Sequence, residues 1–413
     1  MGTTLRWPLA VACLALALAP ACAGDQDGAP PARAATSTAT GAGSPGGAAT
    51  TGPSPAATGR TAASPHWKLF AGARLGGAAA LLDVAASGPR DAWAVGYKDG
   101  AEDSEGRPAL QHWDGTRWTE TPEGAGDAGR LLGVSAAGAR DVWVVGAGDS
   151  PYAAHWDGTR WTPRHPYGVA EEYVLSDVAA HGGHAWLAGR NTTQGVITEW
   201  TGRGFRNALR ADGYFTAVTA TTGHVWAVGN DAAAPDAQGG PMIWHGSAVS
   251  GTAIQSWQRA RTPAIPGGVL RGVWTAGPDD VWAVGAVTAP GGGPRTPRTP
   301  LVLHWDGLAW RSVEVPVPGG ALDGVTGSGP GDVWISGVDA DHSGQALFLH
   351  FDGTGWSRSY GPLVREHREG QQYEESDDVR RTGIARVPGA GGLWAVGSVG
   401  AGDEEDDFIL RHR

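Results

Sequence analysis

Five histidines recur at one position of a repeated phrase, where an imidazole could bind a metal ion, transfer a proton or make a hydrogen bond. The phrase reads HWDGTRW at 112–118 and 155–161, HWDGLAW at 304–310 and HFDGTGW at 350–356. The histidines at this position are His112, His155, His304, His350 and His412. Because each copy belongs to a separate repeat, the five imidazoles are not expected to converge. The pattern predicts hydrogen bonding within each repeat in place of a metal site.

Tyrosine is concentrated outside the repeated segments, although those segments use tryptophan freely. A tyrosine offers rigid apolar area with a polar tip, which suits contact with a glycan or a peptide. All seven tyrosines lie in the variable loops or at strand ends beside them, and we take them as candidate ligand-binding residues: Tyr97, Tyr152, Tyr167, Tyr173, Tyr214, Tyr360 and Tyr373. The alternative is that tyrosine simply tolerates exposure at these positions.

Acidic side chains gather in three stretches: DGAEDSEG from residue 99, EGQQYEESDD from 369 and DEEDD from 403. A further segment, DADHSG from 339, resembles the opening of an oxygen-rich calcium loop, but His350 stands where the closing glutamate belongs. We favour an acidic rim that is solvated or attracts a basic partner, with Arg295 and Arg298 as a small positive counterpart. No cofactor is then expected. The alternative is a calcium site, whose candidate ligands are Asp339, Asp341, Asp403 and Asp406.

The elements that must position these side chains are short β-strands arranged in seven repeats. A first strand ends in valine or isoleucine, and a second follows about nine residues later with a DVWAVG-like sequence. The second strands begin at Asp91, Asp141, His184, His224, Asp280, Asp332 and Gly392. A third strand ends in the HWDG phrase or a variant of it, such as EWTG from residue 199 or IWHG from 243, and a fourth carries an aromatic residue. Four strands in each unit of this size predict an all-β fold, a seven-bladed β-propeller with antiparallel blades.

The two ends of the repeat region predict how the ring closes. The seventh unit stops at FILRHR, residues 408–413, and has a third strand but no fourth. HWKLF, residues 66–70, supplies a tryptophan-bearing strand just before the first unit. We therefore expect the N-terminal strand to complete the last blade, which leaves no exposed sheet edge.

The connections between strands predict two different faces. Turns from the first to the second strand and from the third to the fourth are short, and DG favours a tight hairpin. The other connections vary widely in length and emerge on the opposite face, where recognition is usually placed. Near the axis we expect small residues in the first strands, namely Gly133, Ala217, Gly272, Gly324 and Gly383.

Over residues 66–413 the repeats resemble known propeller families. VWAVG followed by HWDG and a fourth-strand tryptophan resembles kelch and galactose-oxidase blades, and the DGTxW turn is similar to the Asp-box of sialidase-like propellers. The repeats also resemble the DVWAVG repeats of exported actinobacterial proteins. They depart from kelch blades, which have paired glycines after the second strand, since Tyr97 follows Gly96 here. The resemblance implies a fold more than a function.

The N-terminus resembles a bacterial export signal, predicted at residues 1–21. An apolar run at 9–18 is followed by small residues and Cys22. The end of this segment resembles a lipoprotein cleavage site, so Cys22 is the candidate lipid attachment residue, with an ordinary secretory signal as the alternative. Residues 22–64 are rich in Ala, Gly, Ser, Thr and Pro, which predicts a disordered tether before a propeller at 65–413.

The sequence favours binding over catalysis. The formal net charge of −11 argues against a nucleic-acid partner. Residues 65–413 contain no cysteine for the crosslinked copper site of a galactose oxidase, and no nucleophile elbow, phosphate loop or zinc-ligand spacing is found.

We expect an exported monomer, anchored to the membrane through lipid only or secreted, that binds an extracytoplasmic protein or a cell-wall glycan. A scaffold role is included in this expectation, with Tyr167, Tyr173 and Tyr214 as its test residues. The alternative is a carbohydrate-active propeller enzyme, a hydrolase or a lyase. Convergent carboxylates with shifted pKa values in a pocket on the variable face would favour that alternative.

Overall fold

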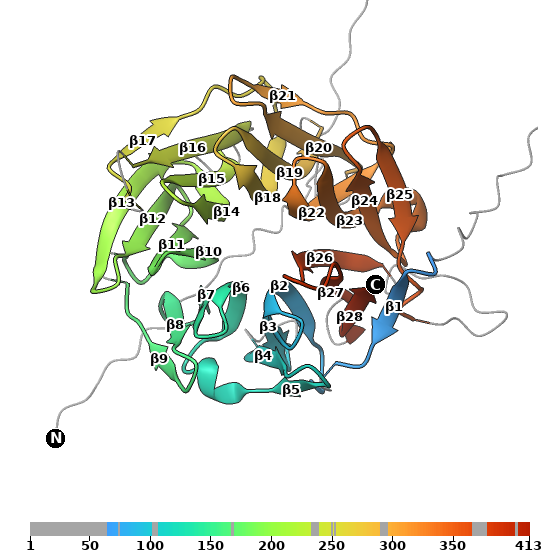
Figure 1. The fold of residues 1–413 in the computed structure, drawn as a ribbon, viewed down its shortest axis with the longest axis horizontal. Helices are drawn as coiled ribbons and strands as arrows, with labels where there is room; N and C mark the ends of the chain where they lie inside the picture. The colour runs from blue at the N-terminus through green and yellow to red at the C-terminus, as the bar shows by residue number, and fades with distance from the viewer. Residues whose placement is uncertain are drawn as a thin grey trace, which may run out of the picture. The chain divides into compact units, whose positions relative to one another are not determined.

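The computed structural model describes residues 64–72, 75–100, 106–166, 169–232, 239–248, 251, 253–289, 296–365, 378–400 and 404–413. These ranges fall within a compact unit that spans Ala57–Arg413. Their strands form seven four-stranded sheets, which follow one another around a ring (Figure 1). The predicted all-β, seven-bladed propeller is confirmed. The signal peptide predicted at 1–21, Cys22 and the tether predicted at 22–64, apart from its last residue, lie outside the described residues.

Six blades are continuous in sequence. Blade 1 consists of β2 (Ala80–Gly88), β3 (Asp91–Lys98), β4 (Arg107–Trp113) and β5 (Trp118–Glu120). Blade 2 consists of β6 (Arg130–Gly138), β7 (Asp141–Ala147), β8 (Tyr152–Trp156) and β9 (Trp161–Pro163). Blade 3 consists of β10 (Val174–His181), β11 (His184–Arg190), β12 (Gln194–Trp200) and β13 (Phe205–Asp212).

The next three blades repeat this order, with the first strand nearest the axis and the fourth at the perimeter (Figure 1). Blade 4 consists of β14 (Tyr214–Thr221), β15 (His224–Asn230), β16 (Pro241–Ser247) and β17 (Ser256–Arg259). Blade 5 consists of β18 (Gly268–Gly277), β19 (Asp280–Thr288), β20 (Arg298–Trp305) and β21 (Trp310–Ser312). Blade 6 consists of β22 (Gly320–Gly329), β23 (Asp332–Asp339), β24 (Ala346–Phe351) and β25 (Trp356–Tyr360). The 3₁₀ turns η1 (Pro122–Gly124) and η2 (Ala340–His342) lie in connections.

Blade 7 joins the two ends of the propeller. It consists of β26 (Val379–Arg386), β27 (Leu393–Val399), β28 (Asp406–His412) and, from the N-terminal side, β1 (Trp67–Phe70). β1 pairs antiparallel with β28, so that Trp67 lies opposite His412. Trp67 is 3% exposed and stacks on Phe348 of blade 6 with centroids 3.6 Å apart. The predicted closure of the ring by the N-terminal strand is confirmed.

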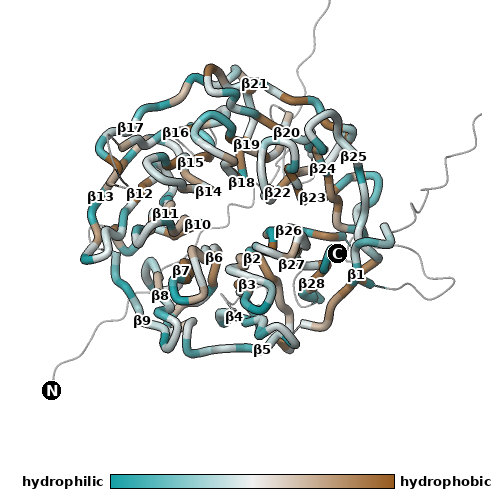
Figure 2. The backbone as a smooth tube through the Cα atoms, viewed as in Figure 1, coloured by the Kyte–Doolittle hydropathy of each residue, from teal (hydrophilic) through white to brown (hydrophobic). Residues whose placement is uncertain are grey.

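The core consists of layers between neighbouring blades. In β3 the five residues 92–96 are all buried, because both faces of the strand are covered. Trp93 of blade 1 makes an edge contact with Trp161 of blade 2, their centroids 5.1 Å apart. Apolar residues follow the strands, while hydrophilic residues gather in the connections (Figure 2). Within the described ranges, no helix has the length and apolar character needed to cross a membrane.

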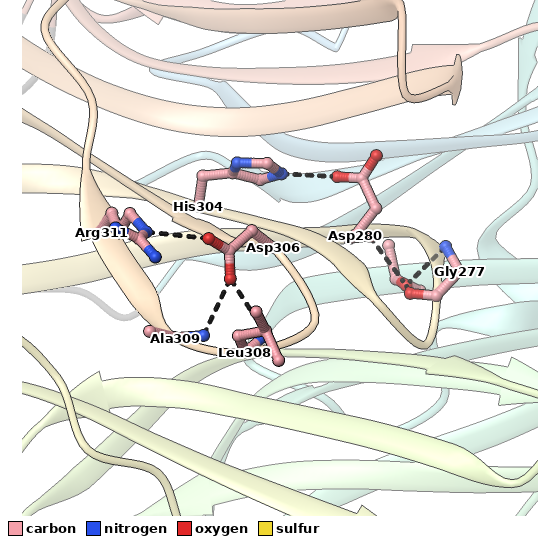
Figure 3. A network of polar contacts seen from close by, with 8 residues as sticks. Gly277, Asp280, His304, Asp306, Leu308, Ala309 and Arg311 are labelled. Carbon is pink, nitrogen blue, oxygen red and sulfur yellow. Dashed lines mark hydrogen bonds and ion pairs between the residues drawn. The ribbon is translucent and has the colours of Figure 1, made fainter.

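The antiparallel order of the strands gives the ring two faces. We call the face with the first-to-second and third-to-fourth connections the turn face. In blade 5, Asp306 Oδ1 accepts hydrogen bonds from the backbone N–H of Leu308 at 3.0 Å and Ala309 at 2.8 Å (Figure 3). Gly307, which follows Asp306, has a φ of +86°, a conformation that favours glycine. The same aspartate bonds recur at Asp114, Asp157 and Asp352, as the tight-turn prediction requires.

We call the opposite face, with the second-to-third connections and the links to the next blade, the loop face. Its connections differ widely in length. Gly213 alone joins β13 to β14, whereas residues 361–378 separate β25 from β26. The loop face is therefore the variable part of the ring.

Candidate functional site

Four of the five repeated histidines pair with an aspartate at the start of the second strand of their own blade. His304 Nε2 lies 2.8 Å from Asp280 Oδ1 (Figure 3). The ring of His304 stacks on Trp282. The equivalent pairs are His112 with Asp91, His155 with Asp141 and His350 with Asp332. Blade 3 exchanges the partners, since His184 on the second strand bonds Glu199 on the third at 2.9 Å. The prediction of hydrogen bonding within each repeat is confirmed for these four.

His412 departs from this pattern because Gly392 replaces the aspartate in blade 7. Its ring lies 4.8 Å from that of Trp334 and 5.0 Å from that of Trp67. Burial, together with the nearby His66 and His350, lowers the pKa of His412. Within the described part of the chain, no three His, Cys, Asp or Glu side chains are placed to hold a metal ion together.

Two candidate tyrosines use their hydroxyls inside the propeller. Tyr97 donates to Glu405 Oε2 at 2.6 Å, and this bond joins blade 1 to blade 7. The guanidinium of Arg130 lies 4.5 Å from the centre of the same ring. Tyr360 is 2% exposed and donates to Asp339 Oδ2 at 2.5 Å. Burial and the neighbouring carboxylates raise the pKa of both phenols above their usual range.

The other described tyrosines differ in how much of the ring is free. Tyr173 is 3% exposed and lies beside Arg210. Tyr152 donates to the backbone oxygen of Gly124 at 3.2 Å, and burial raises its pKa to about 12. Tyr214 is partly exposed and makes no hydrogen bond through its hydroxyl to any described residue. Tyr167 and Tyr373 lie outside the described residues, and a ligand-binding role for the seven stays a prediction.

The candidate calcium ligands do not come together among the described residues. Asp339 is buried, and its carboxylate accepts from Asp341 N–H and from Tyr360. Asp406 instead pairs with Arg365 at 2.7 Å. Asp403 lies outside the described ranges.

A polar pocket that the sequence analysis did not identify lies on the axis of the ring. Its volume is about 100 Å³, and the first strands of all seven blades line it. The charged residues in its wall are Asp83, Asp177, Arg271, Asp323 and Arg381. They come from β2, β10, β18, β22 and β26, whose ribbons surround the centre of the ring (Figure 1).

Two of these aspartates each join neighbouring blades. Asp83 of blade 1 accepts from Val84 N–H and from Val134 N–H of blade 2, both at 2.8 Å. Asp177 of blade 3 likewise accepts from Val178 N–H at 2.7 Å and from Val218 N–H of blade 4 at 2.8 Å. Each carboxylate therefore satisfies an N–H in each of two blades.

The same two carboxyls have raised pKa values. Burial raises the pKa of Asp83 to about 6. Burial and the charge of Asp83 raise the pKa of Asp177 to about 8, and the nearby Arg381 opposes both shifts. Like charges in an enclosed site disfavour double ionisation, so Asp177 retains a proton at neutral pH.

The remaining wall of the pocket contains one satisfied ion pair and one unsatisfied hydroxyl. Arg271 Nη1 donates to Asp323 Oδ1 at 2.7 Å. Thr382 also lines the pocket and is 1% exposed, but its hydroxyl oxygen has no hydrogen-bond partner among the described residues. An unpaired buried hydroxyl is uncommon in native proteins.

One signal in the sequence could have located this pocket. The residue before the first-strand valine or isoleucine is glycine or alanine in five blades, as predicted for the crowded axis. In blades 1 and 3 the same position holds Asp83 and Asp177. A charged residue at a position that otherwise takes only glycine or alanine indicates a special role.

Comparison with known proteins gives similar folds and no family. No family model matches the chain, and no curated protein is significantly similar to it. A structure of YCF48 bound to a D1 peptide is 16% identical, covering 84% of this chain and 95% of that one, with a TM-score of 0.48. SapL1 lectin in complex with α-methyl fucoside is 14% identical, covering 81% and 94%, with a TM-score of 0.41. A PL25 ulvan lyase bound to an oligosaccharide is 10% identical, covering 83% and 95%, with a TM-score of 0.49.

Proposed function

We propose that the protein is a non-catalytic binding or scaffold protein outside the cytoplasm, which contacts a protein or cell-wall glycan through its loop face. In this proposal Cys22 carries a lipid that holds the monomeric chain at the outer side of the cytoplasmic membrane. The three similar structures have TM-scores below 0.5. The proposal therefore rests on the residues of this chain.

The observation that carries the proposal is the difference between the two faces. The turn face repeats one solution, in which Asp–Gly turns and His–Asp pairs bond within their own blade. The loop face changes from blade to blade while resting on the same rigid strands. Variable loops on a rigid scaffold are where binding residues are usually found.

Thermal unfolding of the full chain tests this proposal with a panel of ligands. The panel contains purified cell-wall polysaccharides, a lysine-rich peptide and a glutamate-rich peptide. A ligand at 100 times its Kd adds about 2.7 kcal/mol to the free energy of unfolding, so a true ligand raises Tm. A panel without any such shift would count against the proposal.

A matched pair of blocked variants then locates the bound ligand. In a Cys13→Ser, Cys22→Ser background, Glu172→Cys places a thiol on an exposed loop-face connection, and Arg160→Cys places one in an exposed turn. Each thiol is coupled to a polyethylene glycol maleimide. The polymer at Glu172→Cys should abolish the thermal shift, and the polymer at Arg160→Cys should leave it unchanged. The reverse pattern would assign binding to the turn face and contradict the proposal.

One observation favours a second candidate, a carbohydrate-active hydrolase or lyase. Asp83 and Asp177 are convergent carboxyls with raised pKa values in a pocket, which is the arrangement expected of an acid–base pair. Incubation of the same polysaccharides with the chain and with Asp177→Asn tests this candidate through reducing ends and unsaturated products. Product formed only by the unmodified chain would replace the non-catalytic proposal with the enzyme.

A further inference from the structure

The five charged residues in the wall of the axial pocket, three aspartates and two arginines, carry a net charge of −1 when all are ionised. Arg271 and Asp323 form one ion pair at 2.7 Å, and the side chain of Asp323 is 1% exposed. Arg298, at the exposed start of β20, adds a positive charge near that pair. The other ionisable wall residues are Asp83, Asp177 and Arg381. When Asp83 and Asp177 are both ionised, these two carboxylates and Arg381 together carry one excess negative charge.

The pocket also has spare capacity to accept hydrogen bonds. In Asp83 and Asp177, each of the two carboxylate oxygens accepts one backbone N–H. Every one of these oxygens has a second lone pair. The hydroxyl oxygen of Thr382 is buried in the same wall without a partner among the described residues. Two carboxylates and one hydroxyl are three accepting groups, one for each N–H donor of a primary ammonium.

The size of the pocket limits the occupant to a small group. A volume of about 100 Å³ corresponds to roughly three water molecules. An ammonium is a compact point charge on a flexible stem, so it could enter such a pocket with a methylene or two behind it.

We propose that the axial pocket binds a primary ammonium group, supplied by a lysine side chain of a basic polypeptide partner. Asp83, Asp177 and Thr382 would accept its three N–H bonds. The identity of the partner rests on the binding role proposed above, but the pocket itself can be tested with a free amine. The net charge of −11 on the chain favours approach of such a partner.

Binding of an ammonium should release a proton. The bound cation and the proton retained by Asp177 neutralise the same excess charge, so they compete. The charged groups that face this site are Asp83 on β2, Asp177 on β10, Arg271 on β18, Asp323 on β22 and Arg381 on β26. β6 and β14 contribute Leu132, Thr216 and Ala217, which carry no charge.

The test is calorimetric titration of the full chain with n-butylamine at several pH values between 6 and 8, with n-butanol as the neutral control. Affinity for the amine should increase with pH, by up to about tenfold per pH unit if one proton is released. The same titration in buffers of different ionisation enthalpy counts that proton. Asp177→Asn should abolish the proton release.

Matched variants separate this role from a structural one. Thr382→Val removes a hydroxyl with no partner among the described residues, so the chain should fold while amine affinity falls by about tenfold or more. Thr198→Val removes a buried hydroxyl far from the pocket that donates to Arg206 O, and should leave amine affinity unchanged. Arg381→Gln removes the opposing positive charge and should tighten amine binding.

Three results would overturn the inference. The first is n-butylamine binding no more tightly than n-butanol. The second is amine affinity unaffected by Thr382→Val. The third is binding of acetate that Arg381→Gln abolishes, which would make the pocket an anion site. Because the probe is a free amine, each result leaves the panel test of the loop face standing.

Discussion

The turn face and the loop face are made by the same seven blades but use their polar side chains differently. On the turn face, four blades repeat one His–Asp pair within the blade, as in that of His304 with Asp280, and Asp332 also pairs with Arg386 of blade 7. Towards the loop face the bonds do not repeat, since Tyr97 bonds Glu405 of blade 7 whereas Tyr360 bonds Asp339 within blade 6. At the axis, Asp83 and Asp177 also bond between blades, while the hydroxyl of Thr382 lacks a partner among the described residues. The turn face therefore repeats one set of polar contacts, whereas the polar contacts of the loop face and the axis differ from blade to blade.

This difference separates stability from recognition. Aromatic stacking and the turn-face pairs should set most of the free energy of unfolding. Substitutions on the loop face or in the axial pocket should change binding with little effect on folding. Four predictions test that division, beginning with the largest expected effect.

Trp67→Ala should cause the largest loss, because it removes the buried aromatic anchor of the strand that closes the ring. Loss of a buried tryptophan side chain lowers the free energy of unfolding by about 3–5 kcal/mol. Leu69→Ala in the same strand is the control, since Leu69 is 52% exposed and should change stability by no more than about 0.5 kcal/mol. Urea denaturation measures both, and equal effects would show that closure does not depend on Trp67.

His304→Ala should have a smaller effect, because one hydrogen bond and one stacking contact are lost on the turn face. A loss of about 1–3 kcal/mol is expected when the partner aspartate is left unpaired. His165→Ala removes an exposed histidine from a loop-face connection and should alter stability by less than about 0.5 kcal/mol. If the two variants unfold at the same urea concentration, the two faces do not differ in this way.

The two groups of aspartates should give stability opposite dependences on pH. Threonine hydroxyls and backbone N–H groups hold the pKa of Asp114, Asp157 and Asp352 at about 2, and backbone N–H groups do the same for Asp306. The contribution of these turns is therefore present above the unfolded value of 3.8 and is lost as pH falls towards 2. The pKa values of Asp83 and Asp177 are raised to about 6 and about 8, so their contribution is present below 3.8 and is lost as pH rises towards 8.

Tm measured from pH 3 to pH 9 checks this contrast. The unmodified chain should lose stability between about pH 4 and pH 8, and Asp177→Asn should flatten that part of the curve. Butylamine should also flatten it by occupying the pocket. If Tm falls with pH equally in the unmodified chain and in Asp177→Asn, other groups cause the titration.

Thr382→Val should have the smallest effect on stability. The hydroxyl it removes has no partner among the described residues, so the change in the free energy of unfolding should lie within about 0.5 kcal/mol or be a slight gain. Urea denaturation of the variant gives this value. A loss of 2 kcal/mol or more would mean that the hydroxyl is satisfied in solution and the pocket has less spare capacity than proposed.

Much of the architecture could be predicted because the repeat is regular. The HWDG phrase located the third strand in four blades, and the position of Trp67 before the first unit predicted ring closure. The Asp–Gly turns followed from local chemistry, because an aspartate side chain and a glycine with positive φ form this hairpin wherever it occurs.

The axial pocket could not be predicted in the same way, because its charged residues are widely separated in the sequence. Asp83 and Arg381 meet only after the ring has closed. Which side chains face the axis also depends on an irregular register in the first strands, between Leu81 and Asp83 and again between Leu175 and Asp177. For the tyrosines, the sequence predicted the position in the fold but not the contacts of the side chain. Their loop positions were evident, but the contacts that bury Tyr173 and Tyr360 come from segments that the repeat pattern does not relate.

Hydrogen exchange of the full chain with and without the panel ligand that gives the largest thermal shift tests the central claim most directly. Protection should appear in loop-face connections, such as residues 164–173 and 313–319, and in the first strands around the axis. The Asp–Gly turns, such as residues 157–160 and 306–309, should exchange at unchanged rates. Protection confined to those turns would contradict the assignment of recognition to the loop face.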